Sequence, residues 1–399
     1  MSKFGGTKRI KTTLTSFMAY FVMSSVITPL GIVSQAMAQH FDTGVTATTA
    51  LFSYLTTGIL IGTFLSIFVY TVISIRLLNV FSGILLATTL ASLLLVEQFW
   101  WLTVLFAIIG ICCGLLLAAA VIVLTKTYSE RSRARALLIT DSFYSLAGVV
   151  AGFTTGQLLS AGYHWGSAYF PAIVVSMILV LIAAASDYPQ VDSTPSLSKR
   201  DVKTVRWPTS VIVIGLALLI YIVSFIIIYS WVPVYASESL GATSEQGGSL
   251  VSRFFLGLFV GQLIVFATSF RVSLFWLLGG LLISSFAATF AIWNVSTTAA
   301  LAVAMLALGF LSGGILKTLL TYGTMLVAQP TTKMVSFLLL CTAIGSSMGP
   351  AMSSLIVESF GTRAALVSVS VGYMITGLLV FGSLLSPIRP PTHEEKVHD

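Results

Sequence analysis

The chain has 399 residues, of which 57% are hydrophobic and 8% are charged, and its mean hydropathy is +1.00. About 25% of the residues of an average soluble domain are charged, so a soluble protein of this length could not cover its surface with so few charges. The composition therefore excludes an ordinary soluble protein and predicts an integral membrane protein.

Apolar runs of the length needed to span a bilayer, about 20 residues, occur twelve times along the chain. The runs are 13–38, 47–74, 78–96, 100–125, 136–161, 166–186, 208–236, 247–269, 273–292, 297–328, 334–357 and 365–386. Helices satisfy their own backbone groups in lipid, so we expect an all-α protein with twelve transmembrane helices. The first run has basic residues before it and no clear small-residue cleavage site, which favours a membrane helix over a cleaved signal peptide.

The basic residues predict the orientation of these helices. If both termini are cytoplasmic, 17 of the 20 Lys and Arg residues lie in cytoplasmic segments. Arg363 falls in an outer loop, and Arg253 and Lys317 fall inside predicted helices. This bias follows the positive-inside rule. The net charge of +7 is then explained by topology and by contact with anionic membrane lipid, with no nucleic-acid partner.

The chain divides into two predicted halves, 1–186 and 208–399, each with six helices. Residues 187–207 join them and have the Pro, Ser and mixed charge of a flexible cytoplasmic linker. Three glycine pairs recur between the halves, which predicts pseudo-symmetric repeats with close helix packing. The pairs are Gly58/Gly62 with Gly257/Gly261 and Gly110/Gly114 with Gly309/Gly313, both 199 residues apart, and Gly148/Gly152 with Gly345/Gly349, 197 apart.

Four stretches carry a resemblance to a known family: "LLITDSFYSLAG", "SWVPVYASESLG", "MVSFLLLCTAIGSSMGP" and "VESFGTRAAL". With the six-plus-six pattern, they resemble the major facilitator superfamily, in its fucose-permease-like branch. The resemblance implies a transporter of the bacterial inner membrane whose helices 1, 4, 7 and 10 line a central substrate site. The acidic residues of that branch on helices 1 and 4 are missing here, and the position matching Asp141 is a sugar-contacting polar residue there. Fucose is therefore not the expected substrate.

Three charged residues lie inside the predicted helices: Asp141, Lys317 and Arg253. Intramembrane charges are costly and mark binding sites or ion pathways by default. We expect Asp141 to carry the coupling proton and all three to bind substrate. The structural alternatives are packing bonds for Asp141, pairing with Asp141 or snorkelling for Lys317, and snorkelling to the outer surface for Arg253.

Other residue types add few functional signals. Cys112, Cys113 and Cys341 lie in apolar runs with no CxxC spacing, and the four histidines are scattered, so no metal site or cofactor is expected. No enzyme motif is present. Trp231 and Tyr235 end the seventh predicted helix, where an aromatic belt at the membrane surface is the favoured interpretation and an outer gate the alternative.

The sequence thus predicts a secondary active transporter, monomeric and proton-coupled as a symporter, that moves a sugar-like or anionic small molecule by alternating access. Two other functions stay open at this point. One is a proton-driven exporter of drugs or toxic compounds, and the other is a membrane sensor or scaffold that transports nothing.

Overall fold

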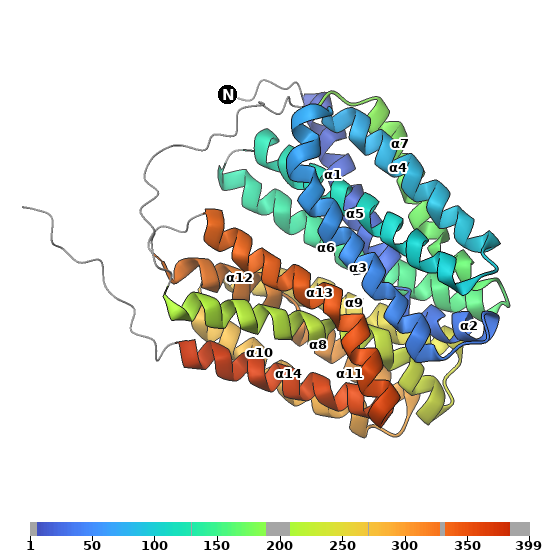
Figure 1. The fold of residues 1–399 in the computed structure, drawn as a ribbon. Helices are drawn as coiled ribbons and strands as arrows, with labels where there is room; N and C mark the ends of the chain where they lie inside the picture. The colour runs from blue at the N-terminus through green and yellow to red at the C-terminus, as the bar shows by residue number, and fades with distance from the viewer. Residues whose placement is uncertain (1–5, 129, 189–207, 270, 328–331, 384–399) are drawn as a thin grey trace, which may run out of the picture.

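A computed structural model describes residues 6–128, 130–188, 208–269, 271–327 and 332–383 of the chain. Within these ranges the chain forms fourteen α-helices and two short 3-10 helices, and no strand (Figure 1). Most of the predicted linker 187–207 and the predicted C-terminal tail from residue 384 on lie outside the described residues.

The helices of the first half are, in chain order, α1 (Gly6–Ile27), α2 (Leu30–His40), α3 (Val45–Val72), α4 (Ile75–Ser92), η1 (Leu93–Leu95), α5 (Phe99–Thr127), α6 (Glu130–Ser160), η2 (Trp165–Tyr169) and α7 (Phe170–Ala184). Those of the second half are α8 (Thr209–Leu240), α9 (Ser244–Thr268), α10 (Leu274–Asn294), α11 (Thr298–Ser312), α12 (Ile315–Met325), α13 (Thr332–Phe360) and α14 (Thr362–Gly382).

Two of the twelve predicted spans are each built from two helices. The first, 13–38, is divided into α1 and α2 at Pro29, which has no backbone N–H to continue the helical ladder. The tenth, 297–328, is divided into α11 and α12 at Gly313 and Gly314. Gly314 has φ +93°, a left-handed conformation that side chains other than glycine rarely adopt. The prediction of single continuous helices was wrong at these two places.

By length and composition, eleven helices or helix pairs in the described part of the chain are apolar enough to cross a membrane. The predicted fifth span corresponds to α6, which is 31 residues long. Asp141, Ser145 and several Gly and Thr residues dilute its apolar character. A helix with this composition suits a position inside the bundle, and α6 does pack against α1 of its own half and α9 of the other.

Glycines at equivalent positions in the two halves allow equivalent helix pairs to pack closely. An added side chain at Gly58 or Gly110 would collide with the backbone of the facing helix in the α3–α5 pair. Gly257 and Gly309 meet in the same manner in the α9–α11 pair. These are the pairs predicted from the 199-residue repeat, and their close packing agrees with two pseudo-symmetric halves.

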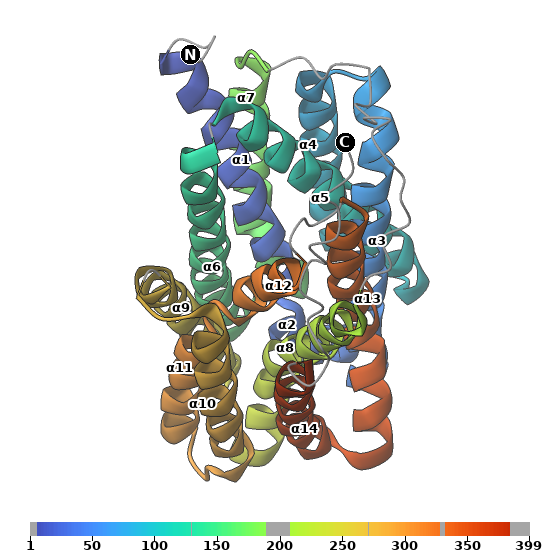
Figure 2. The same ribbon diagram turned by 90° about the vertical axis from the view of Figure 1, so that its left-hand side faces the viewer.

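The two halves contact each other mainly through α6 with α9, α3 with α13, and α2 with α8. Figure 1 shows the halves close together near α2 and wider apart toward the end where α1 begins and α14 ends. Figure 2 shows α12 between the halves, near α6 and α1. We call these two ends of the bundle the α2 end and the α1 end.

Candidate functional site

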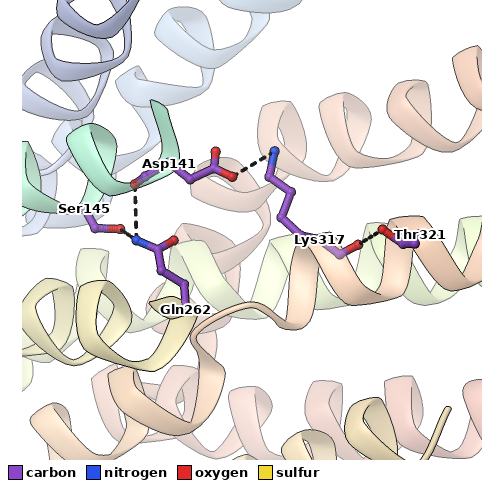
Figure 3. Close-up of polar contacts among 5 residues, drawn as sticks. All are labelled: Asp141, Ser145, Gln262, Lys317 and Thr321. Atoms are coloured by element: carbon purple, nitrogen blue, oxygen red, sulfur yellow. Dashed lines mark hydrogen bonds and ion pairs between the residues drawn. The ribbon is translucent and has the colours of Figure 1, made fainter. Parts of the chain in front are cut away.

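The candidate site is an ion pair that joins the two halves. The Nζ atom of Lys317 on α12 lies 3.3 Å from Oδ2 of Asp141 on α6 (Figure 3). The structure thus brings together two of the three predicted site residues, from segments 176 residues apart in the sequence. Each charge neutralises the other inside the bundle, which offsets part of the cost of placing them there.

The backbone around Asp141 is fixed by α9. The side-chain amide of Gln262 donates to the Asp141 carbonyl oxygen at 3.3 Å and to Oγ of Ser145 at 3.0 Å (Figure 3). These bonds leave the carboxylate of Asp141 uninvolved, so its oxygens remain available to Lys317. Gln262 therefore holds the acidic residue in place from the opposite half of the molecule.

Two tyrosines surround the ion pair. Tyr20 on α1 hydrogen-bonds Thr140 and interacts electrostatically with both Asp141 and Lys317. Tyr144, one turn after Asp141, interacts electrostatically with its carboxylate and lies with its ring 6.2 Å from that of Phe255 on α9. The site therefore combines one cation, one anion, phenol hydroxyl groups and aromatic ring faces.

The break in the tenth span decides where Lys317 sits. Because the chain turns at Gly314, α12 begins a new helix, and Lys317 is its third residue. The N-terminus of a helix carries partial positive charge, so a lysine there is electrostatically unfavourable and an anion favourable. The carboxylate of Asp141 supplies that anion. A continuous helix would not have placed Lys317 in a first turn.

The two charges differ in their access to solvent. The side chain of Lys317 is 52% exposed, whereas that of Asp141 is 18% exposed. Of the two charges, the ammonium group of Lys317 is therefore the more accessible and the carboxylate of Asp141 the more covered.

Arg253, the third predicted site residue, does not join the pair. It is exposed on α9, on the same face as Leu256, Val260 and Leu263, which are 42%, 39% and 47% exposed. This apolar stripe turns away from the helices of the bundle, toward where lipid would lie. The geometry is that of the snorkelling alternative, and Arg253 is left out of the site proposed below.

The aromatic residues that end α8 are buried. Trp231 is fully buried and Tyr235 is 6% exposed, so these two side chains do not form a lipid-facing belt, and that interpretation was wrong. They lie in the half of α8 that α2 packs against, where Gly31 is pressed against the carbonyl groups of Tyr229 and Ser230. This tight contact closes the α2 end of the interface between the halves.

No group of three or more His, Cys, Asp or Glu side chains in the described ranges is placed to hold a metal ion. The three cysteines are buried and free.

Sequence reasoning missed Gln262 and Tyr20. Gln262 stands in the apolar run "GLFVGQLIVFA", and a lone amide inside a predicted helix is a signal that could have identified it. Tyr20 lies in "SFMAYFVM", where nothing distinguishes it from an ordinary membrane aromatic residue.

Comparison with known proteins agrees with this architecture. The chain is 28% identical to Protein TsgA of Escherichia coli (strain ATCC 8739) and of Shigella sonnei (strain Ss046), over 94% of its own length and 95% of theirs. A bacterial homolog of the human lysosomal transporter Spinster, solved in an inward-facing and unoccupied conformation, has a TM-score of 0.74 at 16% identity, covering 96% of this chain and 98% of that one.

Two further solved structures share the fold. The nucleoside transporter NupG has a TM-score of 0.72 at 13% identity, covering 95% of this chain and 99% of that one. FucP in the outward conformation has a TM-score of 0.63 at 16% identity, covering 94% and 99%. The family model described as Major Facilitator Superfamily matches residues 12–330. With most of the chain inside that match, and with the fold shared along almost its whole length, the protein belongs to the Major Facilitator Superfamily of membrane transporters.

Proposed function

We propose that this protein is a secondary active transporter that moves a small solute by alternating access and couples the movement to protons at Asp141. The active unit is a monomer of two halves, 1–186 and 208–399, which rock about the bound solute. The ion pair between Asp141 and Lys317 is the observation that carries this proposal, because it joins the halves through charges that a proton or a solute can change.

The reasoning from the pair to coupling is electrostatic. A protonated Asp141 no longer attracts Lys317, so one proton removes a direct link between α6 and α12. Release of the proton restores the link. A proton gradient can therefore bias the relative position of the two halves, which is what a secondary transporter needs in order to move solute uphill.

For the membrane we propose the bacterial inner membrane, with both termini in the cytoplasm. The support for the orientation is the distribution of basic residues along the sequence, and the relatives named above are bacterial. In this orientation the α1 end faces the cytoplasm and the tightly packed α2 end faces outward. A reporter enzyme fused after Gly241, between α8 and α9, should be active outside, and activity inside would reverse the arrangement.

The decisive experiment on function uses Asp141→Asn in proteoliposomes. The amide resembles the protonated acid in shape but cannot release a proton. We expect proton-driven uphill uptake to be lost, while exchange of solute across the membrane continues, because exchange requires rocking but no net proton step. Retained uphill uptake in the variant would rule out the coupling role of Asp141.

A matched control is Glu358→Gln, which makes the same carboxylate-to-amide change at an exposed position near the end of α13. It should transport as the unmodified protein does. If Asp141→Asn abolished uptake and exchange together while the control kept both, Asp141 would be a solute ligand and not the coupling group.

A further inference from the structure

The site geometry points to a substrate class: we propose that the transported solute is an organic monoanion, which takes the place of Asp141 beside Lys317 and is carried together with one proton. This inference rests on the transporter function proposed above and deepens it. Its starting point is that the protein already holds a carboxylate beside Lys317, and this carboxylate is the side chain of Asp141.

The charge balance of such a site is fixed. In the empty state, the ammonium of Lys317 and the carboxylate of Asp141 sum to zero. When a solute carboxylate binds to Lys317, Asp141 loses its counter-ion and keeps a negative charge inside the bundle. A carboxylate in that position takes up a proton, because the charged form is no longer compensated. The loaded state then holds Lys317 paired with the solute, and a neutral Asp141, and it sums to zero again.

This balance makes the coupling strict. A solute anion bound without a proton leaves one negative charge, and a proton bound without the anion leaves one positive charge. Moving either charged form through a low-dielectric interior is costly, whereas the empty and the fully loaded forms are both neutral. The neutral forms are therefore the ones that change orientation. One proton travels with each monoanion, and no net charge crosses the membrane.

Three features favour an anion over a cation or a zwitterion. Lys317 is the accessible partner and Asp141 the covered one, at 52% and 18% exposure. Lys317 stands in the first turn of α12, where the helix itself favours negative charge. The tyrosine hydroxyl groups of Tyr20 and Tyr144 lie close to Asp141 and can donate hydrogen bonds to an acidic group, but they add no negative charge for an ammonium ion.

No further charged group among the described residues changes the charge balance of the site. Among the described residues, Lys317 from α12, Tyr20 from α1 and Tyr144 on α6 itself are the titratable groups that interact with Asp141. From α9 the neighbour is Gln262, which does not titrate. Arg253, also on α9, lies on the exposed face described above.

The first test asks whether Asp141 binds a proton when Lys317 no longer neutralises it. In Lys317→Met, infrared spectroscopy of the purified protein at neutral pH should show a new protonated carboxyl band. The band should be absent in the unmodified protein and in Lys317→Met/Asp141→Asn. Arg253→Met is the matched control and should give no band. An unchanged spectrum in Lys317→Met would overturn the proposal, because Asp141 would then keep its charge without a partner.

The second test measures binding with two matched sets of probes: benzoate, benzamide and benzylamine, and glucuronate, glucose and glucosamine. Thermal stabilisation of the purified protein reports binding. We expect at least one carboxylate to stabilise the protein, with an affinity at least about tenfold weaker in Lys317→Ala and unchanged in Arg253→Ala. In weakly buffered solution about one proton should be taken up for each carboxylate bound. The proposal is overturned if neither carboxylate shows Lys317-dependent binding, or if binding takes up no proton.

The two proposals can fail separately. Uphill, Asp141-dependent transport of a neutral or cationic solute would keep the transporter function and reject the monoanion. For a carboxylate that is transported, uptake should respond to a pH gradient and remain unchanged when a membrane potential is imposed with potassium and valinomycin. A strong response to the potential would reject the one-to-one charge balance while leaving transport itself in place.

Discussion

In each half of the molecule one membrane span is broken into two helices. The broken spans do not occupy equivalent positions in the two halves. In the first half the break at Pro29 separates α1 from α2, whereas the corresponding first helix of the second half, α8, runs unbroken for 32 residues. In the second half the break at Gly314 separates α11 from α12, whereas its counterpart α5 runs unbroken for 29 residues.

The two short helices also act at opposite ends of the bundle. α2 packs against α8 at the α2 end, through close backbone contact at Gly31. α12 places Lys317 beside Asp141 farther toward the α1 end. The comparison teaches that, within one repeat architecture, the two short helices make contacts of different kinds between the halves. One depends on shape alone, and the other depends on charge and can respond to protons.

The sharpest way to break the shape-dependent contact is Gly31→Ala. The added methyl group would run into the carbonyl groups of Tyr229 and Ser230, which belong to a helix backbone and cannot move aside. We expect the α2 end to stay open, with transport lost and stability lowered by about 1–3 kcal/mol. The measurements are uptake in proteoliposomes and the thermal unfolding temperature.

Gly377→Ala on α14 is the control for this change, since an added methyl group there meets nothing within 4 Å. Normal transport by Gly31→Ala would show that α2 and α8 do not need this close approach, and the shape-dependent contact would lose its basis.

A second variant, Gly314→Ala, tests the break beside the charged contact. Alanine at φ +93° is strained by about 1–2 kcal/mol, and its methyl group would lie 2.7 Å from Val265. We expect α12 to tilt and the distance between Lys317 and Asp141 to increase, which lowers proton-driven uptake more than solute exchange. Both activities should be measured in the same liposomes.

Gly280→Ala on α10 supplies the comparison, because that position is helical and open, and alanine there should be neutral or slightly stabilising. Equal loss of uptake and exchange in Gly314→Ala would mean that the break serves folding and not the ion pair.

The smallest effect is expected at His164, in the loop after α6. This residue should make the stability of the protein depend on pH through its contacts at the α2 end. Partial burial and the neighbouring His40 on α2 lower the pKa of His164 below its usual 6.5. Its Nδ1 atom accepts a hydrogen bond from the Gly166 backbone N–H, which only the neutral ring can do. Below pH 6.5 the unfolded chain therefore binds more protons at this position than the folded one, and stability falls as the pH decreases.

His164→Asn keeps an acceptor for the Gly166 N–H but cannot titrate. The difference in melting temperature between this variant and the unmodified protein should grow from pH about 7.5 to about 5.5, in favour of the variant. A constant difference over this range would exclude His164 as the pH-sensitive group.

The sequence was sufficient for the class, the family and the two halves. Hydropathy indicates which segments span the membrane. The glycine repeat indicates which helices approach closely, as the contact between Gly58 and Gly110 confirms. The breaks were harder to predict. Pro29 and Gly314 both lie inside apolar runs, and whether a proline or glycine interrupts a membrane helix depends on the packing of its neighbours.

The pairing at the site also depended on tertiary structure. Intramembrane charge singled out Asp141, Lys317 and Arg253, with Arg253 as the weakest of the three predicted substrate-binding residues. What separates Arg253 from the others is the direction of its helix face, and this follows from how α9 packs between α6 and α11. Gln262 could have been noticed as an isolated amide, but its bonds to Ser145 and to the Asp141 backbone join two halves whose relative position the sequence does not report.

The break at Gly314 also gives α12 the mechanics of a lever. The helix has 11 residues, so it extends about 16 Å from the break. Lys317 stands only about 4 to 5 Å from that pivot. A rotation of about 10° would therefore move Lys317 by less than about 1 Å while its far end, at Met325, sweeps about 3 Å. A rotation of α12 small enough to exchange one partner of Lys317 for another therefore moves the far end of the helix much more. At the α1 end this displacement is comparable with the size of a water molecule.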